Sequence, residues 1–392
     1  SRPSAEVDAL LCSLASAPPS MPMPRALLSA LAVAIGAAAP LDFDGYCVAY
    51  GKTYAGEEYA ERKALYEQRI ATHATMNARP GRTWIAGPGP LTDLRPEEMR
   101  RFFGYAGRAG DGGGVLGTMS KMEEDVAFSL PTDVDWRNHT PSVVPDVRQQ
   151  GACGSCWAFS AVATIESVVA QETGKLPRLS PQQLTSCTPN PKNCGGGGGC
   201  SGATSQLAYN YTVMHGLASL RDVPYTSGDT AMSGECAQDH PAVAGITGFV
   251  QLPLNDAPAL LMAVATKGLI SISVDAREWY WYSSGIFDEC DKEEPIPNHA
   301  VTLVGYGQEA GVKYWLIQNS WGRSFGEDGY IRLRRHDSEP CGVNTDPQQN
   351  SGCDGGPPNV TVCGECGVLS DSSYPTGGFL KRDRRLGGDI FV

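Results

Sequence analysis

The sequence predicts an α+β fold in which a helical half and a β-rich half face each other across a cleft. Apolar residues recur at helical spacing over residues 157–169, and β-rich signals begin at about Val243. In addition, a cysteine, Cys156, opens the predicted helix, and a histidine, His299, enters a strand-like run. Reactive side chains contributed by both halves place a candidate site between them, where active sites are common.

Each element follows from a local pattern. A charged helix is expected over residues 57–77, ahead of the two halves. In the helical half, a second helix is expected to begin at Pro181, with Ser180 as its N-cap. The β-rich half has five strand-like runs, residues 246–250, 269–274, 299–304, 313–318 and 329–333.

Cys156 has the local setting of an activated nucleophile. The Gly-rich turn at residues 151–155 is small enough for a substrate carbonyl to approach the backbone. At a helix N-terminus the peptide dipoles favour the thiolate, which is the reactive form of cysteine. Taken alone, a cysteine is more often a buried apolar residue or half of a disulfide.

The general base follows by elimination among six histidines. Only His299 stands inside a strand-like run, which would hold its imidazole in one orientation. Asn319 can accept a hydrogen bond from that ring and fix its tautomer, and Trp321 would shield the bond from water.

The order Cys156, His299, Asn319, together with the Cys-Gly-Ser-Cys-Trp run at residues 153–157, resembles the papain/cathepsin cysteine peptidases. The resemblance covers nearly the whole chain after the first forty residues. It implies a papain-like two-subdomain fold, a helical half and a β-barrel-like half. It also implies that Cys156 is the nucleophile, His299 its ion-pair partner and later general acid, and Asn319 the orienting residue. The Gln150 side chain and the Cys156 backbone N–H would form the oxyanion hole.

The same resemblance implies a substrate-binding surface made of Gly154, Gly202, Ala203, Thr204, Ser205, Asn298, Ala300, Trp321 and Asp371. Gly202 and Ala203 would pair with the backbone of an extended substrate, and alanine serves at position 203 if its φ stays negative. Asp371, at a pocket floor where many relatives have a small neutral residue, suggests acceptance of Arg or Lys. The alternative is a solvated Asp371 that points away. Phe325 stands where relatives commonly have a second Trp, so an altered preference on the leaving-group side is expected.

Residues upstream resemble the inhibitory prosegment of cathepsin L-like peptidases. Glu58, Arg62 and Asn77 keep that pattern, whereas Tyr66, Arg69 and His73 depart from it. An ordinary salt-bridged surface helix is the alternative. We expect residues 1–40 to comprise upstream residues and a secretory signal peptide, whose apolar run is residues 26–39. Residues 41–128 would be the prosegment and linker, and residues 129–392 the papain-like peptidase domain. The processing cut is expected between about Ser120 and Leu130.

Thirteen cysteines point to an oxidising compartment. Cys12 and Cys47 precede the peptidase domain, and setting Cys156 aside leaves an even number. The resemblance implies the bridges Cys153–Cys200, Cys187–Cys236 and Cys290–Cys366. The partners of Cys194, Cys341, Cys353 and Cys363 stay open, and residues 341–363 look like an insertion. The two Cys-x-x-Cys pairs leave a zinc site or a redox pair as an alternative.

The formal net charge of −12 and the lack of a basic run argue against a nucleic-acid partner. We expect no cofactor, no metal and no membrane span, and a monomer that acts on polypeptides with its own prosegment as inhibitor. The expected location is the secretory pathway, in a lysosome-like or vacuole-like compartment or outside the cell. An endopeptidase is the leading interpretation. The alternatives are an exopeptidase, an inactive binding homologue and a peptide ligase.

Overall fold

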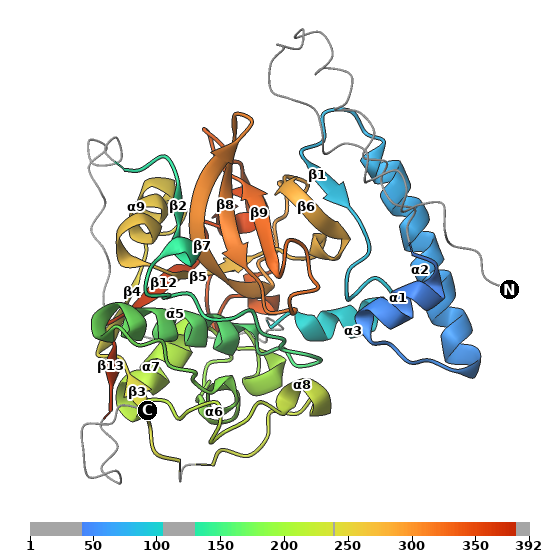
Figure 1. Cartoon of the computed structure of the whole chain (residues 1–392). Helices are drawn as coiled ribbons and strands as arrows, with labels where there is room; N and C mark the ends of the chain where they lie inside the picture. Colours follow the sequence, from blue (N-terminus) through green and yellow to red (C-terminus); the bar gives the residue numbers. More distant parts are fainter. Residues whose placement is uncertain (1–40, 105–129, 238–239, 382–392) are drawn as a thin grey trace, which may run out of the picture. The chain divides into compact units, whose positions relative to one another are not determined.

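The computed structural model describes residues 41–104, 130–237 and 240–381, and from Asp42 onward these form one compact unit (Figure 1). The predicted signal run, the Gly-rich linker and the predicted processing cut lie outside the described residues. No helix within the described ranges is long and apolar enough to cross a bilayer. The architecture is α+β, as the sequence predicts, with a large sheet packed against helices.

The helices begin where the sequence supplies caps. In α6 the Ser180 hydroxyl accepts a hydrogen bond from the backbone N–H of Gln183, and Pro181 takes the first helical position. α5 ends at Gly174, whose φ of 72° only glycine adopts readily. The helices are α1 (Phe43–Tyr50), α2 (Gly56–Asn77), α3 (Pro96–Met99), α5 (Cys156–Thr173), α6 (Pro181–Cys187), α7 (Ser205–His215), α8 (Ser227–Thr230) and α9 (Ala257–Lys267).

The main sheet has the strand order β1-β6-β9-β8-β7-β5-β12-β4, and β2 pairs with β7. All of its neighbours are antiparallel except β6 and β9, which run parallel. Its strands are β1 (Trp84–Ala86), β2 (Val134–Asp135), β4 (Gly248–Gln251), β5 (Ile270–Val274), β6 (Tyr282–Phe287), β7 (His299–Glu309), β8 (Val312–Gln318), β9 (Tyr330–Arg334) and β12 (Ser372–Thr376). The small pairs are β10 (Cys341–Asn344) with β11 (Val360–Cys363), and β3 (Ala244–Gly245) with β13 (Phe379–Leu380).

Each half has its own hydrophobic core. The β-rich half packs around buried side chains such as Trp279, Trp315 and Ile317. The helical half packs around α5 through side chains such as Trp157 and Ile165. α5 also packs against β7, so this helix lies at the boundary between the two halves (Figure 1).

The prosegment contacts the β-rich half through β1, which extends the main sheet by pairing with β6. The Asn77 side chain ties the end of α2 to β1 by exchanging two hydrogen bonds of 2.8 Å with the backbone of Ala86. On the face of α2, Arg62 pairs with Glu58 at 3.1 Å, as the four-residue spacing predicts, and also with Glu98.

Five disulfides join the described cysteines, and Cys47 and Cys156 carry free thiols. The three pairs that the resemblance implies are present: Cys153–Cys200, Cys187–Cys236 and Cys290–Cys366. The pairs left open are Cys194–Cys353 and Cys341–Cys363.

Candidate active site

Cys156 is the first residue of α5, and its sulfur contacts the β-rich half. Its side chain is fully buried, and its Sγ accepts a hydrogen bond from the backbone N–H of Ala300 at 3.2 Å. Ala300 follows His299 at the start of β7. The fold therefore brings a thiol from the helical half against the strand that carries the candidate base.

His299 is held by an amide and an aromatic ring. The distance from its Nε2 to Asn319 Oδ1 is 2.8 Å. The Trp321 ring stacks on the imidazole, with the two ring centroids 4.8 Å apart. Among the described residues, His299 Nδ1 has no hydrogen-bond partner although it is buried. Asn319 and Trp321 thus fix the ring and leave one nitrogen available for proton exchange.

The Gln150 amide is oriented by a residue that the sequence analysis missed. Ser320 Oγ donates to Gln150 Oε1 at 2.6 Å, so the amide nitrogen must point the other way. That nitrogen donates to the carbonyls of Cys153, at 2.9 Å, and Phe102, at 3.1 Å. The one sequence feature that marks Ser320 is its position directly after Asn319.

The backbone of the prosegment occupies the space beside the thiol. A Cβ built on Gly104 would collide with Cys156 Sγ and would lie 2.9 Å from the carbonyl oxygen of Gly154. A Cβ built on Gly202 would in turn collide with the carbonyl oxygen of Gly104. The ring of Phe103 lies 6.3 Å from that of Trp321. Only a residue without a side chain fits at position 104.

Burial keeps both reactive groups neutral in this covered form. Loss of water raises the pKa of the Cys156 thiol to about 12, although the backbone N–H groups of Ala300 and Gly104 oppose the rise. Burial also lowers the pKa of His299 to about 4, against the opposing effect of its bond to Asn319. Both shifts disfavour a thiolate–imidazolium pair while the site is covered.

The structure divides the predicted substrate-binding residues into two groups. Gly154 and Gly202 contact the prosegment backbone, Trp321 stacks on His299, and Ala203 and Ala300 are buried beside the thiol helix. The φ of Ala203 is not positive, as its expected role requires.

The polar side chains of the second group are engaged inside the fold. Thr204 caps α7, Ser205 Oγ donates to the carbonyl of Trp157, and Asn298 Oδ1 accepts from the N–H of Ala276. Their hydroxyl and amide groups therefore make hydrogen bonds within the protein.

Asp371 is only partly exposed, and both of its carboxylate oxygens have protein partners. Gln206 Nε2 donates to Oδ1 at 2.6 Å, and Ser273 Oγ donates to Oδ2 at 2.7 Å. Burial raises the pKa of Asp371, and these two hydrogen bonds oppose the rise. The Asp371 carboxylate is therefore engaged within the protein, and its role in substrate selection stays a prediction.

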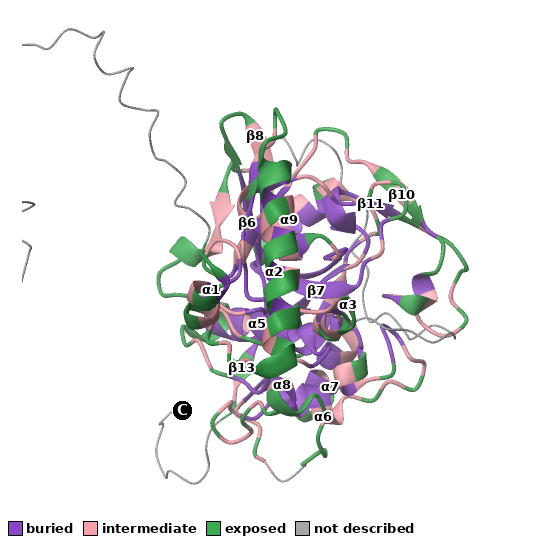
Figure 2. Cartoon of the chain, turned by 90° about the vertical axis from the view of Figure 1, so that its right-hand side faces the viewer, coloured by how far each residue is buried: buried purple, intermediate pink, exposed green. Residues whose placement is uncertain are grey.

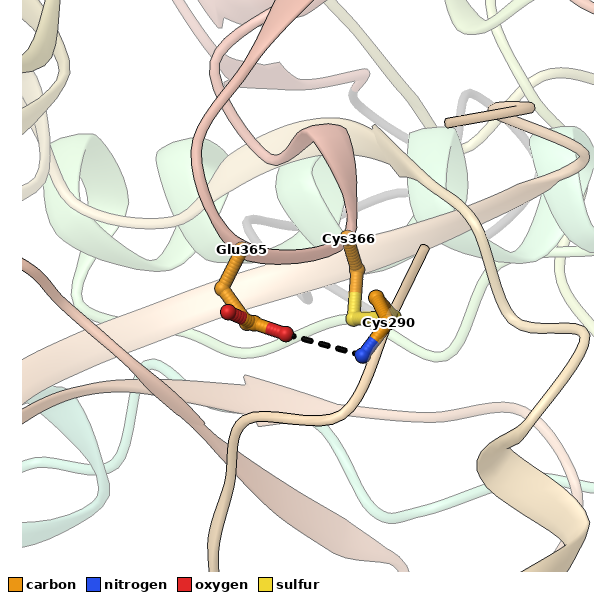
Figure 3. Close-up of side chains that lie close together, drawn as sticks. All are labelled: Cys290, Glu365 and Cys366. Atoms are coloured by element: carbon orange, nitrogen blue, oxygen red, sulfur yellow. Dashed lines mark hydrogen bonds between the residues drawn. A yellow bond between two sulfur atoms is a disulfide. The ribbon is translucent and has the colours of Figure 1, made fainter. Parts of the chain in front are cut away.

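One group of described residues has atoms close enough to hold a metal: Cys290, Glu365 and Cys366 (Figure 3). The two sulfurs form a disulfide, and the Glu365 carboxylate accepts from the N–H of Cys290 at 2.9 Å and pairs with Lys292. These donors are already used, so they do not fit a metal. Both Cys-x-x-Cys pairs are likewise divided by bridges to other cysteines, which contradicts the zinc and redox alternatives.

Known proteins share this architecture. A family model described as "Papain family cysteine protease" matches residues 130–351. Cathepsin S of Rattus norvegicus is 35% identical over 294 residues, which cover 72% of this chain and 84% of that protein. A recombinant stem bromelain precursor superposes with a TM-score of 0.67 and 32% identity, covering 86% of this chain and 97% of that one. Digestive procathepsin L 3 of Tenebrio molitor superposes with a TM-score of 0.65 and 27% identity, covering 85% and 97%. This chain belongs to the papain family of cysteine proteases.

Proposed function

We propose that this protein is a cysteine endopeptidase made as a zymogen. The observation that carries the proposal is the backbone of residues 102–104, which lies against the groups that would handle a peptide substrate. The Phe102 carbonyl accepts from Gln150 Nε2 at 3.1 Å, and Gly104 packs on Cys156 Sγ. A site that holds an extended peptide on a thiol and an amide donor suits acyl transfer.

In the proposed mechanism the Cys156 thiolate attacks the scissile carbonyl carbon, and the C=O π electrons move to oxygen. Gln150 Nε2 and the backbone N–H of Cys156 stabilise the oxyanion. His299, protonated, gives its proton to the departing amine as the C–N bond breaks, and a thioester remains. His299 then takes a proton from water, the hydroxide adds to the thioester carbonyl, and the thiolate leaves. Asn319 keeps the imidazole in position throughout.

The prosegment, proposed as residues 41–128, inhibits by occupying this site with its backbone. It covers the thiol, uses the proposed oxyanion donor and excludes water. Residues 129–392 would then form the peptidase domain. The disulfides among the described residues support passage through an oxidising secretory route, and we propose a monomeric enzyme in a lysosome-like or vacuole-like compartment or outside the cell.

The endopeptidase proposal is tested with processed protein and peptides blocked at both ends. Cleavage at internal bonds, located by mass spectrometry and abolished in Cys156→Ala and His299→Ala, is the expected result. Cleavage restricted to peptides with a free terminus contradicts the internal specificity.

An exopeptidase is the second candidate, and one observation favours it. Residues 341–363 are linked to the glycine-rich loop at Cys194, near the Gly202 end of the site. An insertion in that place can shorten the groove.

A further inference from the structure

Residues 341–363, called the strap here, run from the β-rich half to the helical half. Figure 2 shows β10 and β11 on one flank of the molecule, with the connecting chain descending toward the level of α6 and α7. At its base the strap is a hairpin in which Cys341 pairs with Cys363 and Asn344 pairs with Val360. The bridge Cys341–Cys363 closes that base.

The base of the strap is fixed to the β-rich half by backbone contacts. The N–H of Val343 donates to the carbonyl of Glu293 at 3.0 Å, in the loop that leads to His299. On the other strand, the N–H of Cys363 donates to Asn255 Oδ1 at 3.0 Å, and Asn255 Nδ2 donates to the carbonyl of Thr361 at 2.9 Å.

The tip of the strap is fixed to the helical half. Cys353 is bonded to Cys194, and the N–H of Gly195 donates to the carbonyl of Gly352 at 2.9 Å. A third contact joins Asn193 Nδ2 to Asp354 Oδ2 at 2.8 Å. The strap is thus a covalent connection between the two walls of the cleft.

The strap has a defined shape between its two ends. Asn344 and Asn350 are buried, and Asn344 Nδ2 donates to Asn350 Oδ1 at 2.7 Å. Asn350 Nδ2 in turn donates to the carbonyl of Asp346 at 2.8 Å. Internal hydrogen bonds of this kind hold the tip as a fixed turn.

The strap is attached next to the part of the site that the prosegment occupies. A Cβ on Gly202 would collide with two carbonyl oxygens, that of Gly104 in the prosegment and that of Gly195. Gly195 is the residue that binds Gly352 of the strap. The strap attachment therefore lies next to the chain that occupies the site at Cys156 and Gly202.

We propose that the strap ends the substrate groove beyond Gly202 and so sets how many residues upstream of the cleaved bond contribute to binding. The inference rests on the proposed peptidase function, in which the Gly202 side holds the upstream part of the substrate. A longer upstream part adds nothing to binding, because it meets the strap and must turn away from the groove.

The test compares processed wild-type enzyme with two opened variants. In the first, Cys194→Ser and Cys353→Ser release the tip. In the second, residues 345–359 are replaced by Asn-Gly, which joins the directly paired Asn344 and Val360 by a two-residue turn, and Cys194→Ser removes the unpaired thiol. The matched control is Cys341→Ser with Cys363→Ser, which removes a bridge of the strap but keeps the tip attached.

The substrates are blocked fluorogenic peptides that share one leaving group and have from two to six upstream residues. Rates are referred to active sites titrated with an irreversible thiol reagent, so misfolded molecules are not counted. In the wild type and the control, kcat/KM is expected to stop rising after the shortest peptides. In both opened variants it continues to rise, by about fivefold for the longer peptides, which corresponds to roughly one added hydrogen bond.

The same length profile in the wild type and in both opened variants would overturn the role of the strap. A wild type that cleaves none of these peptides would instead contradict the peptidase activity itself, and with it the inference. The two failures are therefore distinct.

Discussion

At the scale of residues, the site depends on which polar atoms are already engaged. Gln150 Oε1 is taken by Ser320, so the amide nitrogen is presented to a carbonyl. His299 Nε2 is taken by Asn319, so Nδ1 remains for proton exchange. In each side chain, the hydrogen bond made by one polar atom fixes the direction of the other. Stabilisation of an oxyanion requires donors that are held in place in this way.

Replacing Gln150 by Ala is expected to lower kcat about 10²-fold to 10³-fold with little change in KM, because an oxyanion donor is lost. Ser320→Ala keeps Gln150 but leaves its side-chain amide free to rotate. A smaller fall in kcat, about tenfold, is therefore expected. Ser338→Ala, at an exposed position, serves as the control. Steady-state kinetics of processed enzyme measure both constants, and an unchanged kcat in Ser320→Ala would show that Ser320 does not position the amide.

Asp371 is expected to favour substrates with Arg over Phe at the residue upstream of the cleaved one. Because burial raises the pKa of Asp371, its charge appears only as pH rises through that raised value, so the Arg-to-Phe ratio of kcat/KM should increase with pH. Asp371→Ala and the similarly shaped Asp371→Asn should both lower the ratio about tenfold at neutral pH and flatten its pH dependence. A ratio that is unchanged in both variants contradicts the role.

At the scale of elements, α2 adds a second contact between the prosegment and the β-rich half, beside the pairing of β1 with β6. Among the residues that depart from the prosegment pattern of the family, His73 has the clearest consequence. Its side chain is buried against the edge of Trp281, with ring centroids 5.2 Å apart, and neither ring nitrogen has a hydrogen-bond partner among the described residues. Burial, followed by the charges of Arg69 and Arg82, lowers its pKa to about 4. Within the described part of the chain, no acidic group offsets this effect on the pKa of His73.

Acid therefore destabilises the docking of the prosegment. An undocked histidine has its ordinary pKa of about 6.5, so docking loses free energy as pH falls from 6.5 toward 4, up to on the order of 3 kcal/mol. His73→Leu should therefore shift release of the prosegment to lower pH. Susceptibility of the prosegment to an added protease, measured against pH in the Cys156→Ala background, reports that release. His215→Leu, at an exposed position, is the control, and an unshifted midpoint in His73→Leu rules out this trigger.

Prediction from sequence succeeded where the signal is local. The 3.6-residue period and the caps located α5 and α6, and the strand-like runs located β4, β5, β7, β8 and β9. It missed β1 and β6, because these strands pair with segments that are far away in the sequence. It also missed the β10–β11 hairpin, whose strands are joined by a long connection and not by a recognisable two-residue turn. Gly104 could not be identified as the residue against the thiol, since its role depends on the path of the prosegment and on no motif of its own.

At the scale of the whole molecule, the two halves place a helix N-terminus and a strand residue on opposite sides of one cleft. The prosegment fills that cleft with backbone, and the strap connects its walls at one end. We propose that the covered Cys156–His299 site becomes a peptidase once the prosegment is removed.

The most direct test is peptidase activity of the purified zymogen after acidification under mild thiol, beside a Cys156→Ala control. We predict that cleavage of fluorogenic peptides with Phe-Arg or Leu-Arg before the cleaved bond appears together with loss of the prosegment. We also predict that neither change occurs in the control. A folded, processed wild-type protein that cleaves none of these peptides would contradict the account.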